Sequence, residues 1–194
     1  MKFVSSFLLF LCLICSSTVS VYAMDENMFS KSHAIYMKGI DGSESDLEKA
    51  IEYFDKLSVS APFDIFVNTY RGSLRSRMAQ HVLMPWSKMK HVDAGSELMD
   101  NAIDDISEVH DSQTIGGTTL SFRMKLTAAH TYFRFPRFLN RYQDAKDLVA
   151  DLLESPNLET TSQEAKNNLY GLAAEIAEED GDEQKKAAFQ AKII

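Results

Sequence analysis

The sequence SDLEKAIEYFDKLSVSAP, from Ser45 to Pro62, decides the fold of this chain. Its apolar residues recur every three or four positions, which places them along one face of a helix. Ser45 and Glu48 match a capping box, in which a hydroxyl and a carboxylate bond to free amides at the start of a helix. Pro62 marks the end, because proline cannot continue a helix. The stretch predicts one amphipathic helix whose apolar face carries Leu47, Ala50, Ile51, Phe54 and Leu57.

Similar residue orders recur further along the chain. In residues 45–62 a small residue, Ala50, is followed by an apolar residue four positions later and by another three positions after that. The same order occurs twice more, as Gly95, Met99, Ala102 and as Ala145, Val149, Leu152. A helical stretch precedes each of these segments, and another follows the last one, after a capping-box pattern at Thr161 and Glu164. These preceding and following stretches predict helices over residues 28–39, 63–78, 120–133 and 161–179. A weak final helix is predicted over 182–194.

The order of small residue, ring, aliphatic residue and proline in residues 45–62 resembles the second helix of a tetratricopeptide repeat. Tyr70-Arg71-Gly72 is similar to a motif found in many first helices of that family. The resemblance implies an all-α fold of antiparallel helix pairs, about eight helices in a single domain over residues 24–194. The small residues recur after 45 and 50 positions, unlike the family's 34. The sequence is therefore compatible with two architectures, a tetratricopeptide-like α-solenoid and a compact irregular bundle.

Two connections in the chain are longer than the family pattern requires. The first is residues 79–90, which contain Pro85 and the sole tryptophan, and the second is residues 133–141, which is rich in rings and arginines. Exported bacterial helical-repeat proteins with a Pro-Trp turn and a Pro-Phe turn are similar. We expect the two turns to lie on one edge and to bind another protein or peptide, with an acidic one favoured by the basic residues. The candidate partner-binding residues are Trp86, Lys88, Lys90, Arg134, Arg137, Phe138 and Arg141.

The first 23 residues have the pattern of a signal peptide. Lys2 precedes the apolar run FVSSFLLFLCLIC, which is too short to span a bilayer, and Val21-Tyr22-Ala23 resembles a cleavage site. The sequence thus predicts an exported protein, periplasmic or secreted, with no stable membrane insertion once the signal is removed. Cys12 and Cys15 both lie in this segment, so the mature chain would have no disulfide and no thiol nucleophile.

The mature chain is acidic. Removing residues 1–23 takes away Lys2 and no acid, which leaves 19 basic and 28 acidic residues and a net charge of −9. This charge disfavours binding to nucleic acid.

The sequence contains no nucleophile elbow, P-loop or dinucleotide fingerprint, and none of its five histidines lies at a metal-ligand spacing. We therefore expect no enzymatic activity, no catalytic residue, no cofactor and no metal. One alternative is that folding gathers His81, His91 and His130 around a metal ion. Another is a solute-binding or transporter-accessory protein that holds a small ligand between its helices.

We predict that export cleaves the chain after Ala23 and leaves Met24 as the first residue. Mass spectrometry of the intact exported protein measures this directly. A mature protein that still contained Cys15 would contradict the prediction and favour a retained anchor.

Overall fold

The structure, a computed structural model, describes residues 26–194, so the predicted signal peptide lies outside the described residues. The predicted all-α fold of antiparallel helix pairs is confirmed. The elements follow one another as α1 (Glu26–Asp41), α2 (Glu44–Ser60), α3 (Ile65–Met78), α4 (Pro85–Asp104), α5 (Glu108–Ser112), β1 (Thr114–Ile115), β2 (Thr118–Thr119), α6 (Leu120–Phe133), the 3-10 helix η1 (Arg137–Leu139), α7 (Tyr142–Glu154), α8 (Gln163–Glu179) and α9 (Glu183–Gln190).

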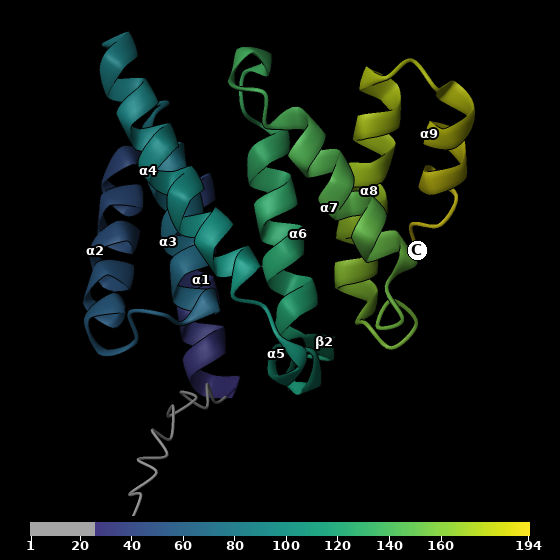
Figure 1. The fold of residues 1–194 in the computed structure, drawn as a ribbon, viewed down its shortest axis with the longest axis horizontal. Helices are drawn as coiled ribbons and strands as arrows, with labels where there is room; N and C mark the ends of the chain where they lie inside the picture. Colours follow the sequence, from purple (N-terminus) through teal and green to yellow (C-terminus); the bar gives the residue numbers. More distant parts are fainter. Residues whose placement is uncertain (1–25) are drawn as a thin grey trace, which may run out of the picture.

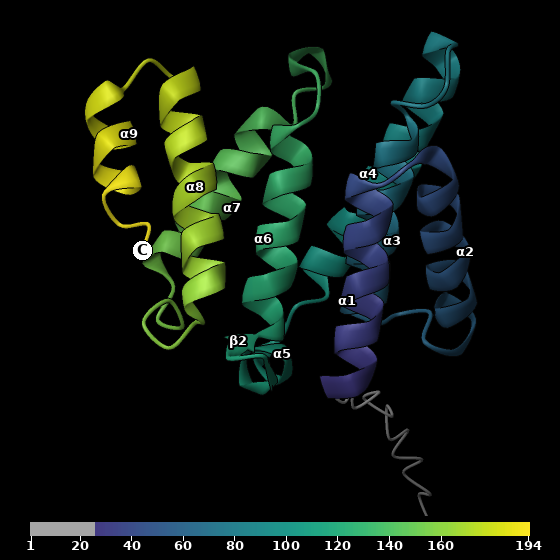
Figure 2. The same ribbon diagram turned by 180° about the vertical axis from the view of Figure 1, so that it is seen from behind.

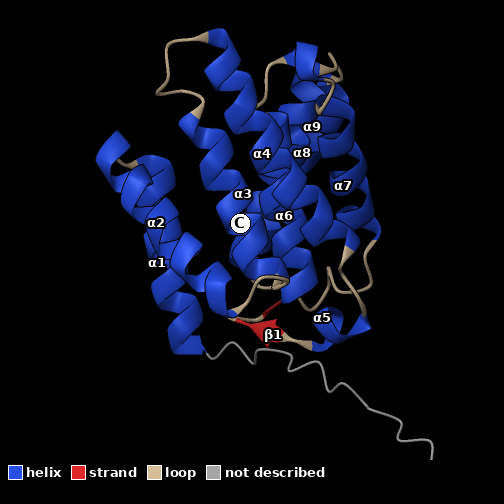
Figure 3. Cartoon of the chain, turned by 60° about the vertical axis from the view of Figure 1, so that its left-hand side comes forward, coloured by secondary structure: helices blue, strands red, loops and turns tan. Residues whose placement is uncertain are grey.

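Four helix pairs stand side by side, in the order α1–α2, α3–α4, α6–α7 and α8–α9 (Figure 1). The connection inside each pair lies at the upper edge of Figures 1 and 2, and the connections between pairs lie at the lower edge. At that lower edge, α5 and the short ladder of β1 and β2 join the second pair to the third (Figure 3). Among residues 26–194, no helix is both long enough and apolar enough to cross a bilayer.

Two of the helices are capped by other residues than the sequence predicts. Helix α2 is capped by Ser43, whose Oγ accepts from the backbone N–H of Asp46 while the Asp46 carboxylate accepts from the N–H of Ser43. Asp46 also forms an ion pair with Lys38 of α1, at 3.0 Å, which favours this box over Ser45 and Glu48. Helix α8 is capped by Ser162. The preceding Thr161 instead donates its hydroxyl to the carbonyl of Asn157.

The predicted long turn over residues 79–90 is wrong. Helix α4 already begins at Pro85, and only residues 79–84 connect it to α3. Proline suits the first position of a helix, because its missing N–H has no partner to bond there and its φ is already helical. Trp86, Lys88 and Lys90 therefore lie in the first turns of α4.

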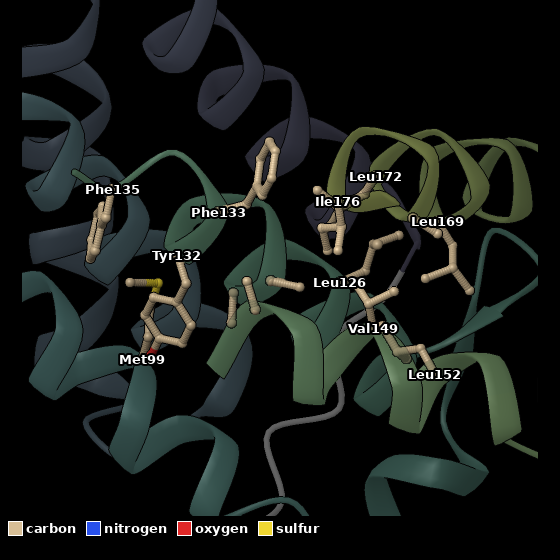
Figure 4. Packing of buried hydrophobic residues seen from close by; sticks show 14 of the residues in the cluster. Met99, Leu126, Tyr132, Phe133, Phe135, Val149, Leu152, Leu169, Leu172 and Ile176 are labelled. Atoms are coloured by element: carbon tan, nitrogen blue, oxygen red, sulfur yellow. The ribbon is translucent and has the colours of Figure 1, made fainter. Parts of the chain in front are cut away.

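The apolar faces form two clusters that meet at Ile103 of α4. The first lies mainly among α1, α2 and α3, where Ala50 and Phe54 are buried as predicted, while Leu57 is only partly buried. The second lies among α4, α6, α7 and α8 (Figure 4). Its largest fully buried side chains include Met99, Phe122, Tyr132, Leu152 and Leu169.

Helices α3 and α4 approach each other most closely at two glycines. A methyl group on Gly72 would lie 2.6 Å from the carbonyl oxygen of Gly95, and one on Gly95 would lie 2.5 Å from that of Gly72. Both glycines are buried in the helix contact. Two backbones at this distance leave no room for a β-carbon on either side.

We predict that Gly95→Ala destabilises the fold by about 1–3 kcal/mol, because the added methyl group overlaps backbone atoms that cannot move away. Gly171→Ala is the matched control, since a methyl group there meets nothing within 4 Å in the middle of α8. This control should stabilise the protein by about 0.5–1 kcal/mol through the higher helix propensity of alanine. Urea unfolding measures both changes, and equal effects of the two substitutions would contradict the close contact.

Candidate functional site

Large apolar side chains are exposed at the upper edge of the array. Trp86 in the first turn of α4 is 70% exposed and Phe138 in η1 is 73% exposed. Leu83 and Met84, in the connection before α4, are exposed as well. The α3–α4 and α6–α7 connections thus lie on the same edge, as the repeat arrangement predicts. Leu83, Met84 and Trp86 are neighbours in the chain, and contiguous exposed apolar groups are typical of binding surfaces.

The start of α4 explains why these side chains reach solvent. Met84 is the N-cap residue, and its side chain makes no capping hydrogen bond. Trp86 and Lys90 are four positions apart, so they lie on one face of the helix, and Lys88 points elsewhere. The burial of α4 starts only at Val92. The first two turns of α4 therefore extend beyond the core.

The arginines of the second connection contact acids of α8. Arg134 lies 2.8 Å from Glu175, and Arg137 lies 2.7 Å from Glu179. The Arg137 guanidinium also lies over the ring of Tyr142, 3.6 Å from its centroid. Burial, followed by a hydrogen bond to Asp180, raises the pKa of Tyr142 to about 12, so this hydroxyl stays neutral and donates. Both arginines thus already have acidic partners within the chain.

The rings of that connection divide into two groups. Phe133 and Phe135 are buried in the second apolar cluster, whereas Phe138 is not. Phe135 packs beside Tyr132, with ring centroids 5.9 Å apart. Most of the aromatic material therefore completes the core, and Phe138 is the ring that faces solvent.

Arg141 is part of a cluster that joins three helices. Its guanidinium lies 4.1 Å from the ring centroid of Tyr132 on α6 and bonds to the carboxylate of Asp100 on α4. Its Nε lies 2.9 Å from Asp144 on α7. The Tyr132 hydroxyl donates to Asp100 at 2.6 Å, and burial together with this bond raises the pKa of Tyr132 well above its usual value.

A groove runs between α4 and α7 on either side of Arg141. Helix α4 packs mainly on α3 and helix α7 mainly on α6, so the two second helices leave open space between them. Two cavities of ≈ 380 and ≈ 510 Å³ follow one another along this space and share Asp100 and Arg141. We call this space the α4–α7 groove. Its acidic lining consists of Asp93, Glu97, Asp100, Asp104, Asp144, Asp147 and Asp151.

Sequence reasoning missed the α4–α7 groove, although its signal is present in the chain. The α4 acids recur at intervals of four, three and four residues, and the α7 acids at three and four. Such spacings place each set on one helix face. The two faces line one groove because of the way the helix pairs pack. The spacing of acids within a single helix does not predict that packing.

The structure brings the predicted binding residues to two places. Trp86 and Phe138 lie at the upper edge, with Lys88, Lys90, Arg134 and Arg137 near them, while Arg141 lies in the α4–α7 groove. The five histidines, all among the described residues, belong to no group of side chains that could hold a metal ion. Within residues 26–194, no group of three His, Cys, Asp or Glu side chains is arranged to hold a metal ion.

Comparisons of this chain with protein-family models, with curated proteins and with solved structures return no match. The upper edge and the α4–α7 groove are therefore the features of the chain that bear on its function.

We predict that Trp86→Ala and Phe138→Ala each change the free energy of unfolding by less than about 0.5 kcal/mol, because neither side chain contributes to the core. Phe54→Ala is the control. Phe54 is fully buried, and its loss should cost about 3–5 kcal/mol through the cavity left behind. Thermal melts compare the three variants. Unfolding of the Trp86→Ala variant at a much lower temperature would mean that the indole plugs the core.

Proposed function

We propose that this chain is an exported, non-enzymatic helical-repeat protein, periplasmic or secreted, that binds another protein or peptide. The observation that carries the proposal is the group of exposed apolar side chains at the upper edge: Leu83, Met84, Trp86 and Phe138. They come from two connections that are far apart in the sequence and lie on one edge of the array (Figure 1). Tryptophan is among the residues that most often dominate binding energy.

The type of cavity also supports a polypeptide partner. The α4–α7 groove is elongated and lies open along the surface. A small solute held between helices, the alternative, would favour an enclosed pocket with few polar groups. An open groove beside an apolar edge suits an extended chain or a helix.

The expected preference for an acidic partner loses its main support. Arg134, Arg137 and Arg141 each contact carboxylates of this chain, so binding an acidic partner would first break those contacts. Exposed ion pairs contribute little stability, typically below about 1 kcal/mol, so carboxylates of a partner can compete with Glu175 and Glu179 for Arg134 and Arg137.

Site-specific cross-linking tests the proposal. A photoreactive amino acid is placed at position 86 or 138, and at position 63 as the control, because Phe63 is equally exposed but belongs to the α2–α3 connection at the lower edge. We expect one and the same protein to be captured from positions 86 and 138 and not from 63. The purified partner should then bind the wild type and lose affinity at least about tenfold for Trp86→Ala, the loss of a typical hot spot.

Two outcomes would contradict the proposed function. One is capture of the same proteins from all three positions, which would indicate adhesion without a specific surface. The other is full affinity of the captured partner for the Trp86→Ala variant.

A further inference from the structure

Lys125 of α6 pairs with Asp151 of the α4–α7 groove, at 2.5 Å, and a second cation, the guanidinium of Arg141, lies within the groove. That group lies over the Tyr132 ring and contacts two carboxylates, Asp100 on one wall and Asp144 on the other. A ring face combined with carboxylates from two helices is an arrangement suited to an arginine or lysine side chain. The chain thus demonstrates, with its own residue, which chemistry this groove accepts.

Acids without a partner continue the groove on both sides of Arg141. Asp93 and Glu97 line the upper cavity, and Asp104 lines the lower one. In the part of the chain from 26 to 194, none of these three side chains forms an ion pair or a hydrogen bond. Like charges three or four positions apart destabilise a helix. A cation placed in each cavity would relieve this repulsion along α4.

Apolar side chains line the groove between the acids. Val92 and Tyr132 are buried at its base, and Leu139 and Leu148 are half-buried in its two cavities. Small hydrated cations would contact the acids alone. A segment that alternates basic and apolar side chains would contact both the acids and the base.

We propose that the α4–α7 groove binds a basic amphipathic segment of the partner protein, with one cationic side chain in each cavity beside Arg141. This inference rests on the proposed function and deepens it, because it names the chemistry of the partner.

The geometry of α4 sets the spacing of the two cations. Asp104 lies seven residues from Glu97 and eleven from Asp93, which on a helix is about 10–16 Å. An extended segment rises about 3.3 Å per residue, so its cationic residues would be about three to five positions apart. Trp86 continues the same helix face, since it lies seven positions before Asp93. The indole can therefore receive an apolar residue at one end of the segment.

The test uses a fluorescein-labelled nine-residue peptide with two arginines four positions apart and leucines between and beside them. Its affinity for the mature chain is measured by fluorescence anisotropy. The groove variant carries Asp93→Asn, Glu97→Gln and Asp104→Asn. The matched control variant carries Glu26→Gln, Glu108→Gln and Glu159→Gln, which changes the net charge by the same amount at exposed acids elsewhere.

We expect the groove variant to bind the peptide roughly tenfold more weakly than the wild type, which is the loss of three moderately exposed ion pairs. The control variant should bind within about twofold, because distant exposed charges are screened at physiological salt. Circular dichroism melts should be the same for both variants, since all six acids are exposed. A second peptide, in which serine replaces every leucine, should bind more weakly than the first.

Several results would overturn the groove proposal. They are equal weakening by the groove and control variants, equal binding of the leucine and serine peptides, and no binding of the leucine peptide to the wild type. The partner captured at position 86 separates this inference from the proposed function. If that partner loses affinity for Trp86→Ala but binds the groove variant as tightly as the wild type, the proposed function stands and the groove proposal falls.

Discussion

The contact between the backbones of α3 and α4 at Gly72 and Gly95 is the constraint on which the arrangement depends. Because neither residue has a β-carbon, the two helices approach until each glycine lies against the other's carbonyl. The first pair uses a similar solution, since a methyl group on Gly39 of α1 would lie 2.6 Å from the β-carbon of Ala50 on α2. Close pairing of α3 with α4 leaves another face of α3 to pack on α6, and this contact joins the second pair to the third.

Between the second and third pairs, the contact of α3 with α6 keeps the second helices, α4 and α7, apart. Helix α3 packs on α6, while α4 and α7 each pack mainly on their own first helix. The faces of α4 and α7 that point toward each other are therefore left with a groove between them, and Arg141 spans it by contacting Asp100 and Asp144. Acidic side chains are tolerated on those faces because the groove is open to solvent and Arg141 and Lys125 pair with some of them. The same packing leaves the start of α4 beyond the core, where Trp86 is exposed.

Local patterns in the sequence predicted the helices well and their ends poorly. The burial of Ala50 and Phe54 follows from periodicity, which is a property of one helix alone. The start of α2 does not follow from periodicity, because Ser43 with Asp46 and Ser45 with Glu48 both resemble a capping box. The ion pair of Asp46 with Lys38, which lies in another helix, favours the first of them. Pro85 is compatible with a turn, but proline is equally suited to the first position of a helix, where it lies in the structure. The partners of Arg134 and Arg137 lie about forty residues away in the chain. Patterns within one helix do not predict contacts at that separation.

The distribution of charge links the upper edge to the α4–α7 groove. The basic residues that attract attention in the sequence are largely satisfied within the fold, at Glu175, Glu179 and Asp100. Several of the acids along α4 are not, so the charge that faces solvent on this side of the molecule is negative. Trp86 belongs to the same face of α4 as those acids, a helical stripe in which Trp86 and Lys90 precede the acidic stretch from Asp93 to Asp104. A partner that contacts this stripe along its length must present an apolar group and then basic ones, which is the order of an amphipathic basic segment.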